Sequence, residues 1–450
     1  MPLPETPPET SLRNPQFEIP NPKFFSNRQS AMPMKRWQKI VLILLGVVVL
    51  TQIPFAYRRY QLGRLHAAIQ SLESQRQEPA LDGLTEYRGV VHVHSFLGGH
   101  SSGTFQEIIS AALTNRLNFV VMTEHPARDF NTADMTLKGF HNGMLFINGN
   151  EVKTASNERL LLLPGDEQAG NASEFSTEDV VKRRNSGLQF VAYPDQFNSW
   201  PLSGVTGVEV YNLYSNTQKM NRLLIFFDSV WSYRKYPDLL FATFYERPSV
   251  TLALWDHAMG KMQQKLVAIA GNDAHANVGL SLNDSSGEPL LGLRLDPYER
   301  SFRLVRLHVL LGASNDGTAT GQVNADGSRT GALNEGSLLA AIGNGHCFIG
   351  FDLFGDTSGF RFSAQDADEK KIMGDEIKLD GEVRLNASIP VPSRVVLFQN
   401  GVAIKEEWGV RSMEFVAKEK GIYRVEAYLS QLPGRVKHQP WIISNPIYIK

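Results

Sequence analysis

Cysteine is almost missing from this chain of 450 residues, which contains only Cys347. A disulfide framework and a cysteine-built zinc site are therefore excluded, and any metal must be held by His, Asp and Glu side chains. An excess of one charge is also missing, since 45 basic and 46 acidic residues give a net charge of -1. Because no overall field attracts nucleic acid, we do not expect a nucleic-acid partner.

Nucleotide-binding signatures are missing too. The sequence has no Walker-type phosphate loop and no Gly-x-Gly-x-x-Gly turn after an expected strand. These absences argue against an open dinucleotide-binding fold. What the sequence does contain is a long apolar run near its start, an alternating strand and helix pattern in its middle, and an all-β pattern at its end.

The N-terminal region predicts a membrane anchor. Residues 1–34 are rich in proline and poor in aliphatic residues, so we expect them to be disordered. A run without charge follows at Ile40–Tyr57 and spans roughly 27 Å as a helix, enough for the core of a bilayer. We predict a transmembrane anchor at 35–59 and a juxtamembrane helix or linker at 60–85. A cleaved signal peptide and a buried core helix are the alternatives.

Basic residues near this run indicate the orientation of the anchor. Because cytoplasmic flanks carry an excess of Lys and Arg, a bias toward the preceding side predicts a single-pass protein whose catalytic body lies outside the cytoplasm. Five basic residues lie close before the run and three shortly after it: Lys23, Arg28, Lys35, Arg36 and Lys39, against Arg58, Arg59 and Arg64.

The region 86–345 alternates short apolar runs with amphipathic stretches. This pattern predicts an α/β domain with a largely parallel sheet, closed into a distorted β/α barrel. The expected strands are Val90–His94, Phe119–Thr123, Met144–Ile147, Leu160–Leu163, Gln189–Tyr193, Val205–Tyr211 and Leu266–Ala270, and the expected helices include Phe105–Leu117, Glu178–Asn185 and Ser249–Gln264.

The region 346–450 follows a helix expected at Glu335–Ile342, and its pattern predicts an all-β structure. Alternating segments at 383–389, 394–399, 412–417 and 423–429 are separated by turn signals such as Asn400-Gly401. This spacing predicts a small antiparallel sandwich of the immunoglobulin-like kind.

Polar side chains gather where the strands of the central region are expected to end. His92 and His94 occupy alternate positions of one strand, where side chains share a face and can bind one divalent ion. Because active sites of β/α barrels form at the carboxyl ends of the strands, we predict a metal site there. The candidate ligands are His92, His94, His100, His125, Glu151, Asp273 and His275.

In their order along the chain these residues resemble the motifs of the PHP family (polymerase and histidinol phosphatase), over about residues 86–312. That resemblance implies metal-dependent phosphoesterase activity on a distorted seven-stranded β/α barrel. The C-terminal region is similar to the branch that includes carbamate and amide hydrolases. The motifs are His92-Val-His94-Ser-Phe-Leu-Gly-Gly-His100, Thr123-Glu124-His125, Glu151 and Asp273-Ala-His275.

The resemblance also implies roles for these residues. One divalent ion would be held by His92, His94, Glu151 and Asp273, and another by His100, His125 and His275, with Glu151 able to bridge. Members with three ions carry a His-Pro pair where this chain has Tyr193-Pro194, so one or two ions per chain are expected. Mixed His and carboxylate ligands suit Zn, Mn and Fe alike. The Tyr193 phenol can instead donate a hydrogen bond to a substrate oxyanion.

We therefore predict a membrane-tethered, metal-dependent hydrolase in which Glu151 and Tyr193 take part in catalysis. Divalent ions can activate water for attack on a phosphoester and neutralise the charge that develops on its oxygens. Hydrolysis of a carbamate or amide at the same site is the alternative reaction. A membrane-anchored binding module with an inert barrel is the alternative class. The sequence names neither the substrate nor the oligomeric state.

Overall fold

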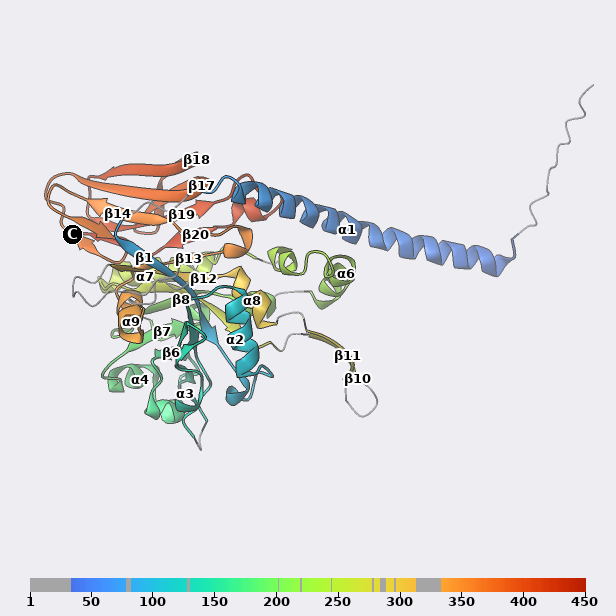
Figure 1. Ribbon diagram of the computed structural model, residues 1–450, viewed down its shortest axis with the longest axis horizontal. Coiled ribbons are helices and arrows are strands. Elements are labelled where there is room, and N and C mark those ends of the chain that lie inside the picture. The colour runs from blue at the N-terminus through green and yellow to red at the C-terminus, as the bar shows by residue number, and fades with distance from the viewer. Residues whose placement is uncertain are drawn as a thin grey trace, which may run out of the picture. The chain divides into compact units, whose positions relative to one another are not determined.

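The computed structural model in Figure 1 describes residues 34–77, 82–127, 130–200, 202–218, 221–243, 245–276, 279–283, 289–294, 297–312 and 333–450. The chain divides into two units, Met1–Ile53 and Pro54–Lys450. The segment expected to be disordered, 1–34, lies outside the described residues except for Met34.

One continuous helix, α1 (Arg36–Glu73), contains nearly all of the predicted anchor at 35–59 and the first part of the juxtamembrane helix or linker predicted at 60–85. A strand already begins at Leu84, within the second of these regions. Pro54 lies inside α1. Its most apolar window of 18 residues has a mean hydropathy of 2.4, and none of that window is buried. A core helix would bury such side chains against the protein, so this exposure favours a membrane span or a signal sequence.

The central sheet is built around β1 (Leu84–Val93), which has a parallel neighbour on each side and also pairs with an antiparallel strand. The parallel neighbours are β2 (Phe119–Met122) and β9 (Val267–Ala274), and the antiparallel one is β12 (Arg306–Gly312). Beyond β2 the sheet continues to β4 (Met144–Ile147) and β3 (Gly139–His141), and beyond β9 to β8 (Gly207–Asn212), β7 (Leu188–Ala192), β6 (Arg159–Leu163) and β5 (Asn150–Lys153).

The sheet is mixed, whereas the sequence pattern predicts a largely parallel one. Antiparallel pairs form between β3 and β4, between β5 and β6, and between β6 and β7. The β3–β4 connection is the pair Asn142-Gly143, whose φ angles of 51° and 80° suit a tight hairpin turn. So short a connection can join only antiparallel strands. The Asn-Gly dipeptide therefore indicated an antiparallel pair in the sequence, although the alternation of strands and helices around it favoured a parallel sheet.

Helices flank the central sheet, among them α2 (Phe105–Thr114), α4 (Thr177–Arg183), α7 (Ser249–Met262) and α9 (Glu335–Gly343). The start of α2 is fixed by a capping box in which the side chains of Thr104 and Glu107 each bond the other residue's backbone N–H. Its buried face presents Ile108 and two alanines to the protein. These four helices lie where the sequence predicts them, within a few residues at each end.

The C-terminal strands are mostly antiparallel, and β17 (Val383–Gln399) and β18 (Val402–Ala417) are the longest. Two segments expected as separate strands, 383–389 and 394–399, belong to one strand, β17. Its register against β18 shifts between Ser388 and Ser393, where Pro390 and Pro392 lack the N–H needed for regular pairing.

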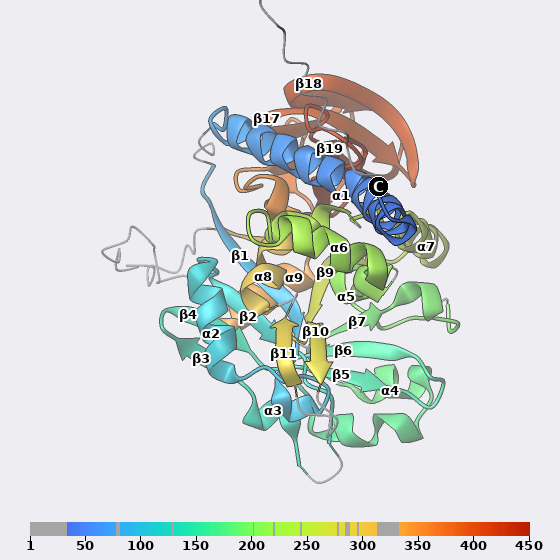
Figure 2. The ribbon, with the colours of Figure 1, turned by 90° about the vertical axis from the view of Figure 1, so that its right-hand side faces the viewer.

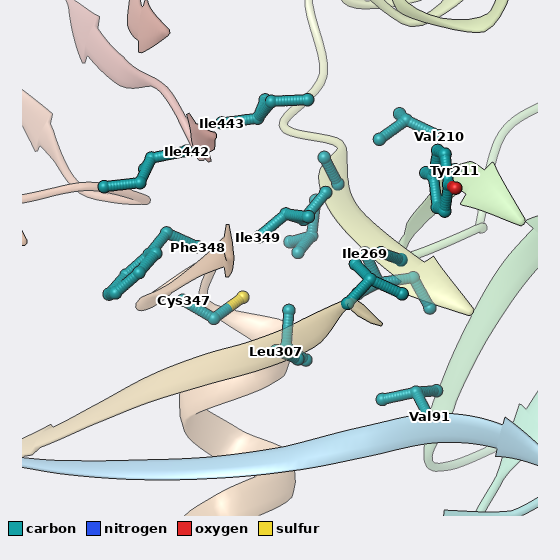
Figure 3. Packing of buried hydrophobic residues seen from close by; sticks show 14 of the residues in the cluster. Val91, Val210, Tyr211, Ile269, Leu307, Cys347, Phe348, Ile349, Ile442 and Ile443 are labelled. Carbon is teal, nitrogen blue, oxygen red and sulfur yellow. The ribbon is translucent and has the colours of Figure 1, made fainter. Parts of the chain in front are cut away.

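The C-terminal strands share a core with the central sheet. The strand β13 (Cys347–Gly350) pairs with β12 on one side and with β20 (Ile442–Ser444) on the other. In Figure 3 side chains such as Val91, Ile269 and Ile349 pack together in one continuous cluster. The C-terminal strands and the central sheet are therefore joined both by hydrogen-bonded strands and by a common core.

Candidate metal centre

Local backbone distortion orients several of the predicted site residues. His92, Tyr193 and Asp273 have φ angles of 67°, 50° and 46°. The pairing of β1 also shifts register between Val91 and Val93, against both of its parallel neighbours. Left-handed backbone is unfavourable for residues other than glycine, and it is found at functional sites. Bulges also occur next to active sites, where they redirect side chains. His92 and His94 thus reach one site through a bulge, and not through the regular alternation that the sequence argument assumed.

Four of the candidate ligands form a compact buried group: His92, His94, Glu151 and Asp273. Nε2 of His92 lies 3.4 Å from Oε2 of Glu151 and 3.5 Å from Oδ1 of Asp273. Nε2 of His94 lies 3.4 Å from each of the same two oxygens. Corners of a tetrahedron whose centre is about 2.1 Å from each ligand are roughly 3.4 Å apart, so these spacings fit one four-coordinate divalent ion.

The hydrogen-bond inventory of this group supports the same interpretation. Nε2 of His92, Nε2 of His94 and Oδ1 of Asp273 are all buried without a hydrogen-bond partner. An unsatisfied buried polar atom costs about 1–3 kcal/mol, so several together at one point need an explanation. A cation accepts lone pairs from both imidazole nitrogens and carboxylate oxygens, and would satisfy all three atoms at once. The donor set therefore fits a divalent metal ion.

A second group of donor atoms comprises His94, His125 and His275. The ring of His94 stacks on the other two, with centroid separations of 4.5 Å and 4.4 Å. Burial and the neighbouring charge of His94 lower the pKa of His125 to about 3 and that of His275 to about 4. Both rings are therefore neutral at pH 7 and can offer a lone pair to a metal.

His100 is placed differently from what the resemblance implies. It is exposed, and among the described residues it belongs to neither group of donor atoms. Its ring nevertheless lies 5.1 Å from that of His125, and it lines the same cavity of about 220 Å³. His100 follows β1 in a loop, and a loop position cannot be deduced from strand periodicity.

Glu209 of β8 is a site residue that the sequence reasoning missed. Its Oε1 lies 2.5 Å from Nδ1 of His92, with both side chains buried. A carboxylate at that nitrogen holds the proton on Nδ1, which leaves Nε2 to face the other donor atoms. Burial lowers the pKa of His92, but the charges of Glu209, Asp273 and Glu151 outweigh it and raise the pKa well above its ordinary value. A lone acidic residue inside the buried run of β8 was the available signal.

The hydroxyl of Tyr193 is hydrogen-bonded to the carboxylate of Asp273, one of the candidate ligands. This hydroxyl donates to Oδ2 of Asp273, and Nδ2 of Asn212 donates to the same oxygen at 3.2 Å. Burial and the charge of Asp273 raise the pKa of the Tyr193 phenol far above its ordinary value, so the phenol keeps its proton. Tyr193 therefore orients Asp273 in this structure, and the expected donation to a substrate oxyanion would require that bond to be exchanged.

Arg159 is a second site residue that the sequence did not indicate, because it belongs to no motif. It begins β6 and donates from Nη1 to Oε1 of Glu151 at 2.8 Å, which leaves Oε2 of Glu151 toward the histidines. Its side chain is 37% exposed and lines the cavity beside His100 and His125. A guanidinium at the rim of such a cavity is suited to an anionic group of a substrate.

The loop after β1 contains a Gly-His-Ser-Ser-Gly string at 99–103, which matches the pattern of a hydrolase nucleophile elbow. The structure does not support that role. The string connects the short helix η1 (Phe96–Gly98) to α2 and does not follow a strand directly. The hydroxyl of Ser101 donates to the carbonyl oxygen of His275 at 2.6 Å, so it is tied to the backbone of the metal centre.

Glu124, the residue before His125, supports the same loop. Its carboxylate accepts hydrogen bonds from the Ser95 backbone N–H at 3.0 and 3.1 Å and from the Thr136 hydroxyl at 2.9 Å. It belongs to neither group of donor atoms among the described residues. Glu124 thus holds the chain in place just beyond His94 and leaves the ligand positions to its neighbours.

Fold and site together define a mixed α/β protein with a buried centre suited to a divalent metal ion. No family model matches the chain, and neither does any curated protein. Several solved structures are similar to it, and two of them are 12% identical in sequence. PsfC from Pseudomonas syringae PB-5123 covers 51% of this chain and 84% of its own length, with a TM-score of 0.29.

The other similar structure is a two-domain protein from Bacteroides vulgatus ATCC 8482, described as containing a predicted PHP-like metal-dependent phosphoesterase. The match covers 83% of this chain and 98% of that one, at 12% identity and a TM-score of 0.33. Its description names the same family that the sequence motifs resemble. At such identities and TM-scores the two likenesses by themselves assign neither a family nor an activity.

Proposed function

We propose that the chain is a membrane-anchored, metal-dependent hydrolase of the PHP type that acts on phosphoesters. The observation that carries the proposal is the convergence of buried, partnerless donor atoms from His92, His94 and Asp273, together with Glu151, at tetrahedral spacing. The order of the strand pairs supports the barrel in this proposal, because a bridge between Glu124 and Asn150 links the end of β2 to β5. The apolar helix α1 supports the anchor.

The residues around the centre have distinct tasks in this proposal. A bound divalent ion would supply Lewis acidity and lower the pKa of water. Glu209 keeps the tautomer of His92 that binds metal, and Tyr193 and Asn212 hold Asp273 in its orientation. The Arg159 guanidinium, at the rim of the cavity, favours a substrate with an anionic group such as a phosphoryl group.

One or two ions per chain fit the arrangement. His94 is common to both groups of donor atoms, so the two sites would be adjacent and would compete for its ring unless other groups complete one of them. Glu151 can take part in both, since its Oε2 also lies 3.4 Å from Nδ1 of His125. A third ion has no imidazole at position 193, where Tyr193 bonds Asp273.

The test uses the full chain purified in detergent. Metal content is measured after dialysis, and hydrolysis is measured on matched chromogenic phosphate monoester, phosphate diester, carbamate and anilide substrates. The comparison variant is Asp273→Asn, which keeps the shape of the side chain but removes its charge. We expect stoichiometric metal and metal-dependent cleavage of a phosphoester in the parent protein, both strongly reduced in Asp273→Asn.

Other outcomes would contradict the proposal in different ways. Cleavage of the carbamate or anilide without cleavage of any phosphoester would keep the metal site but assign it to the other reaction. Absence of tightly bound metal, with an intact fold by circular dichroism, would indicate a binding module.

A further inference from the structure

The helix α6 (Arg222–Ser232) has its polar and apolar faces reversed relative to a helix of a water-soluble protein. Three of its polar side chains point inward, with Asp228, Ser229 and Ser232 only 2%, 4% and 1% exposed. Several of its apolar side chains point outward, with Leu223, Phe226 and Val230 exposed by 65%, 43% and 67%. A surface helix in water shows the opposite arrangement, because burial of apolar surface is what stabilises its packing.

The inward face of α6 packs against the part of α1 that belongs to the same unit. The rings of Phe55 and Phe227 lie 5.0 Å apart, and Nη2 of Arg58 lies 2.7 Å from Oδ2 of Asp228. Figure 2 shows the two helices side by side. The Arg58–Asp228 ion pair explains why a charged residue of α6 can be buried.

These contacts also fix the level of α6 along α1. Arg58 is the first charged residue after the apolar run Ile40–Tyr57, so it marks one boundary of the predicted span. Near that boundary Tyr57 and Tyr60 are 60% and 62% exposed, as expected of aromatic side chains at a membrane interface. A helix that pairs with Arg58 therefore lies at the height of the lipid headgroups if α1 spans a bilayer.

We propose that the outward face of α6, made of Leu223, Leu224, Phe226 and Val230, is inserted into the interface of the same membrane that α1 crosses. An interfacial helix needs an apolar face toward the lipid and a polar face away from it. In α6 the polar face is buried against the protein, where Asp228 pairs with Arg58. The occupant of this face is lipid, and a second copy of the chain is the alternative to be tested. The inference rests on the membrane anchor of the proposed function and is independent of the metal chemistry.

A cavity beside this face has a composition that suits lipid. It has a volume of about 760 Å³ and is lined by both helices, through Tyr57, Arg58 and Leu62 of α1 and Leu224 and Ile225 of α6. The apolar part of this wall can accommodate an acyl chain, and the charged side chains of Arg58, Glu246 and Arg435 lie beside it.

The test uses the full chain reconstituted in phosphatidylcholine vesicles. Because Cys347 is the only cysteine and is fully buried, a new cysteine can be labelled selectively with an environment-sensitive fluorophore. The probe is placed in Val230→Cys, in the matched control Val402→Cys, which is equally exposed at 66% but lies in β18, and in Val47→Cys of the apolar run. Positions 230 and 402 both follow the span, so they face the same side of the membrane in every molecule.

We expect the probe at position 230 to behave like the probe at position 47. It should be quenched by nitroxide-labelled lipid and protected several-fold from aqueous iodide, whereas the probe at position 402 should show the reverse. Equal iodide quenching at positions 230 and 402 would overturn the inference. Protection without quenching by lipid, increasing with the ratio of protein to lipid, would also overturn it in favour of a second copy. A probe at position 47 that lipid does not quench would remove the anchor and the inference together, while metal content of the same protein would still report separately on the hydrolase.

Discussion

The hydrogen bond between Glu209 and His92 should control metal affinity, and Glu209→Gln tests it with little change in shape. The carboxylate serves two partners, because Oε1 meets Nδ1 of His92 at 2.5 Å and Oε2 accepts from Nδ2 of Asn212 at 3.0 Å. A glutamine has only one oxygen, so it can accept from one of these partners and must present its NH₂ group to the other.

Either orientation of the glutamine disturbs the site. With its oxygen toward His92, two amide NH₂ groups face each other at Asn212. With its NH₂ toward His92, Nδ1 must become an acceptor, and the ring proton moves to Nε2, the atom that faces Glu151 and Asp273. Loss of such an outer partner lowers metal affinity by roughly 10- to 100-fold, which corresponds to about 1.4 to 2.8 kcal/mol.

The assay is a competition titration of the metal-free protein against a chromophoric chelator at fixed pH. The control is Glu158→Gln, a buried glutamate that accepts from the Ser199 hydroxyl at 2.6 Å and belongs to neither group of donor atoms among the described residues. We expect Glu158→Gln to affect stability but not metal affinity. Wild-type metal affinity in a folded Glu209→Gln protein would refute the assigned role of Glu209.

Three further predictions concern the candidate metal ligands, the buried His308 and the topology of the chain. His94→Ala should lower the metal content and abolish turnover while the circular dichroism spectrum stays unchanged. His100→Ala should keep its metal, because His100 lies outside both groups of donor atoms. Equal metal content in the two variants would contradict this grouping. Burial lowers the pKa of His308, but Asp352 and Glu86 outweigh it and raise the pKa to about 9. The stabilisation from the charged ring is therefore complete below the pKa of His308 in the unfolded chain, and it is lost as the pH rises through about 9. The difference in unfolding free energy between wild type and His308→Gln should therefore shrink by up to about 3 kcal/mol from neutral to alkaline pH, and a constant difference would show that His308 does not titrate as assigned. A reporter that is active only after export, fused after Lys450, should be active if the body lies outside the cytoplasm, and activity of a reporter restricted to the cytoplasm would reverse that topology.

Much of the local structure follows from the sequence because its signals are short-range. The charge-free run Ile40–Tyr57 lies within α1, and Thr104 and Glu107 form the capping box that starts α2. Strand ends could likewise be placed from apolar runs, which is why His92, His94, Glu151 and Asp273 could be selected as candidates before any contact between them was known. Periodicity and capping depend only on residues a few positions apart, so a sequence records them directly.

The tertiary structure alone decided how these side chains meet. The bulge at His92 depends on pairing with two strands that are distant in sequence, and Glu209 reaches His92 across a separation of 117 residues. The position of His100 outside the group of His94, His125 and His275 depends on a loop, whose course is set by contacts such as that of Ser101 with His275. The reversed faces of α6 likewise depend on the distant partner Arg58. Contacts of this kind arise only when the chain closes on itself, so the residue types were determined by the sequence, but their shared geometry was determined by the fold.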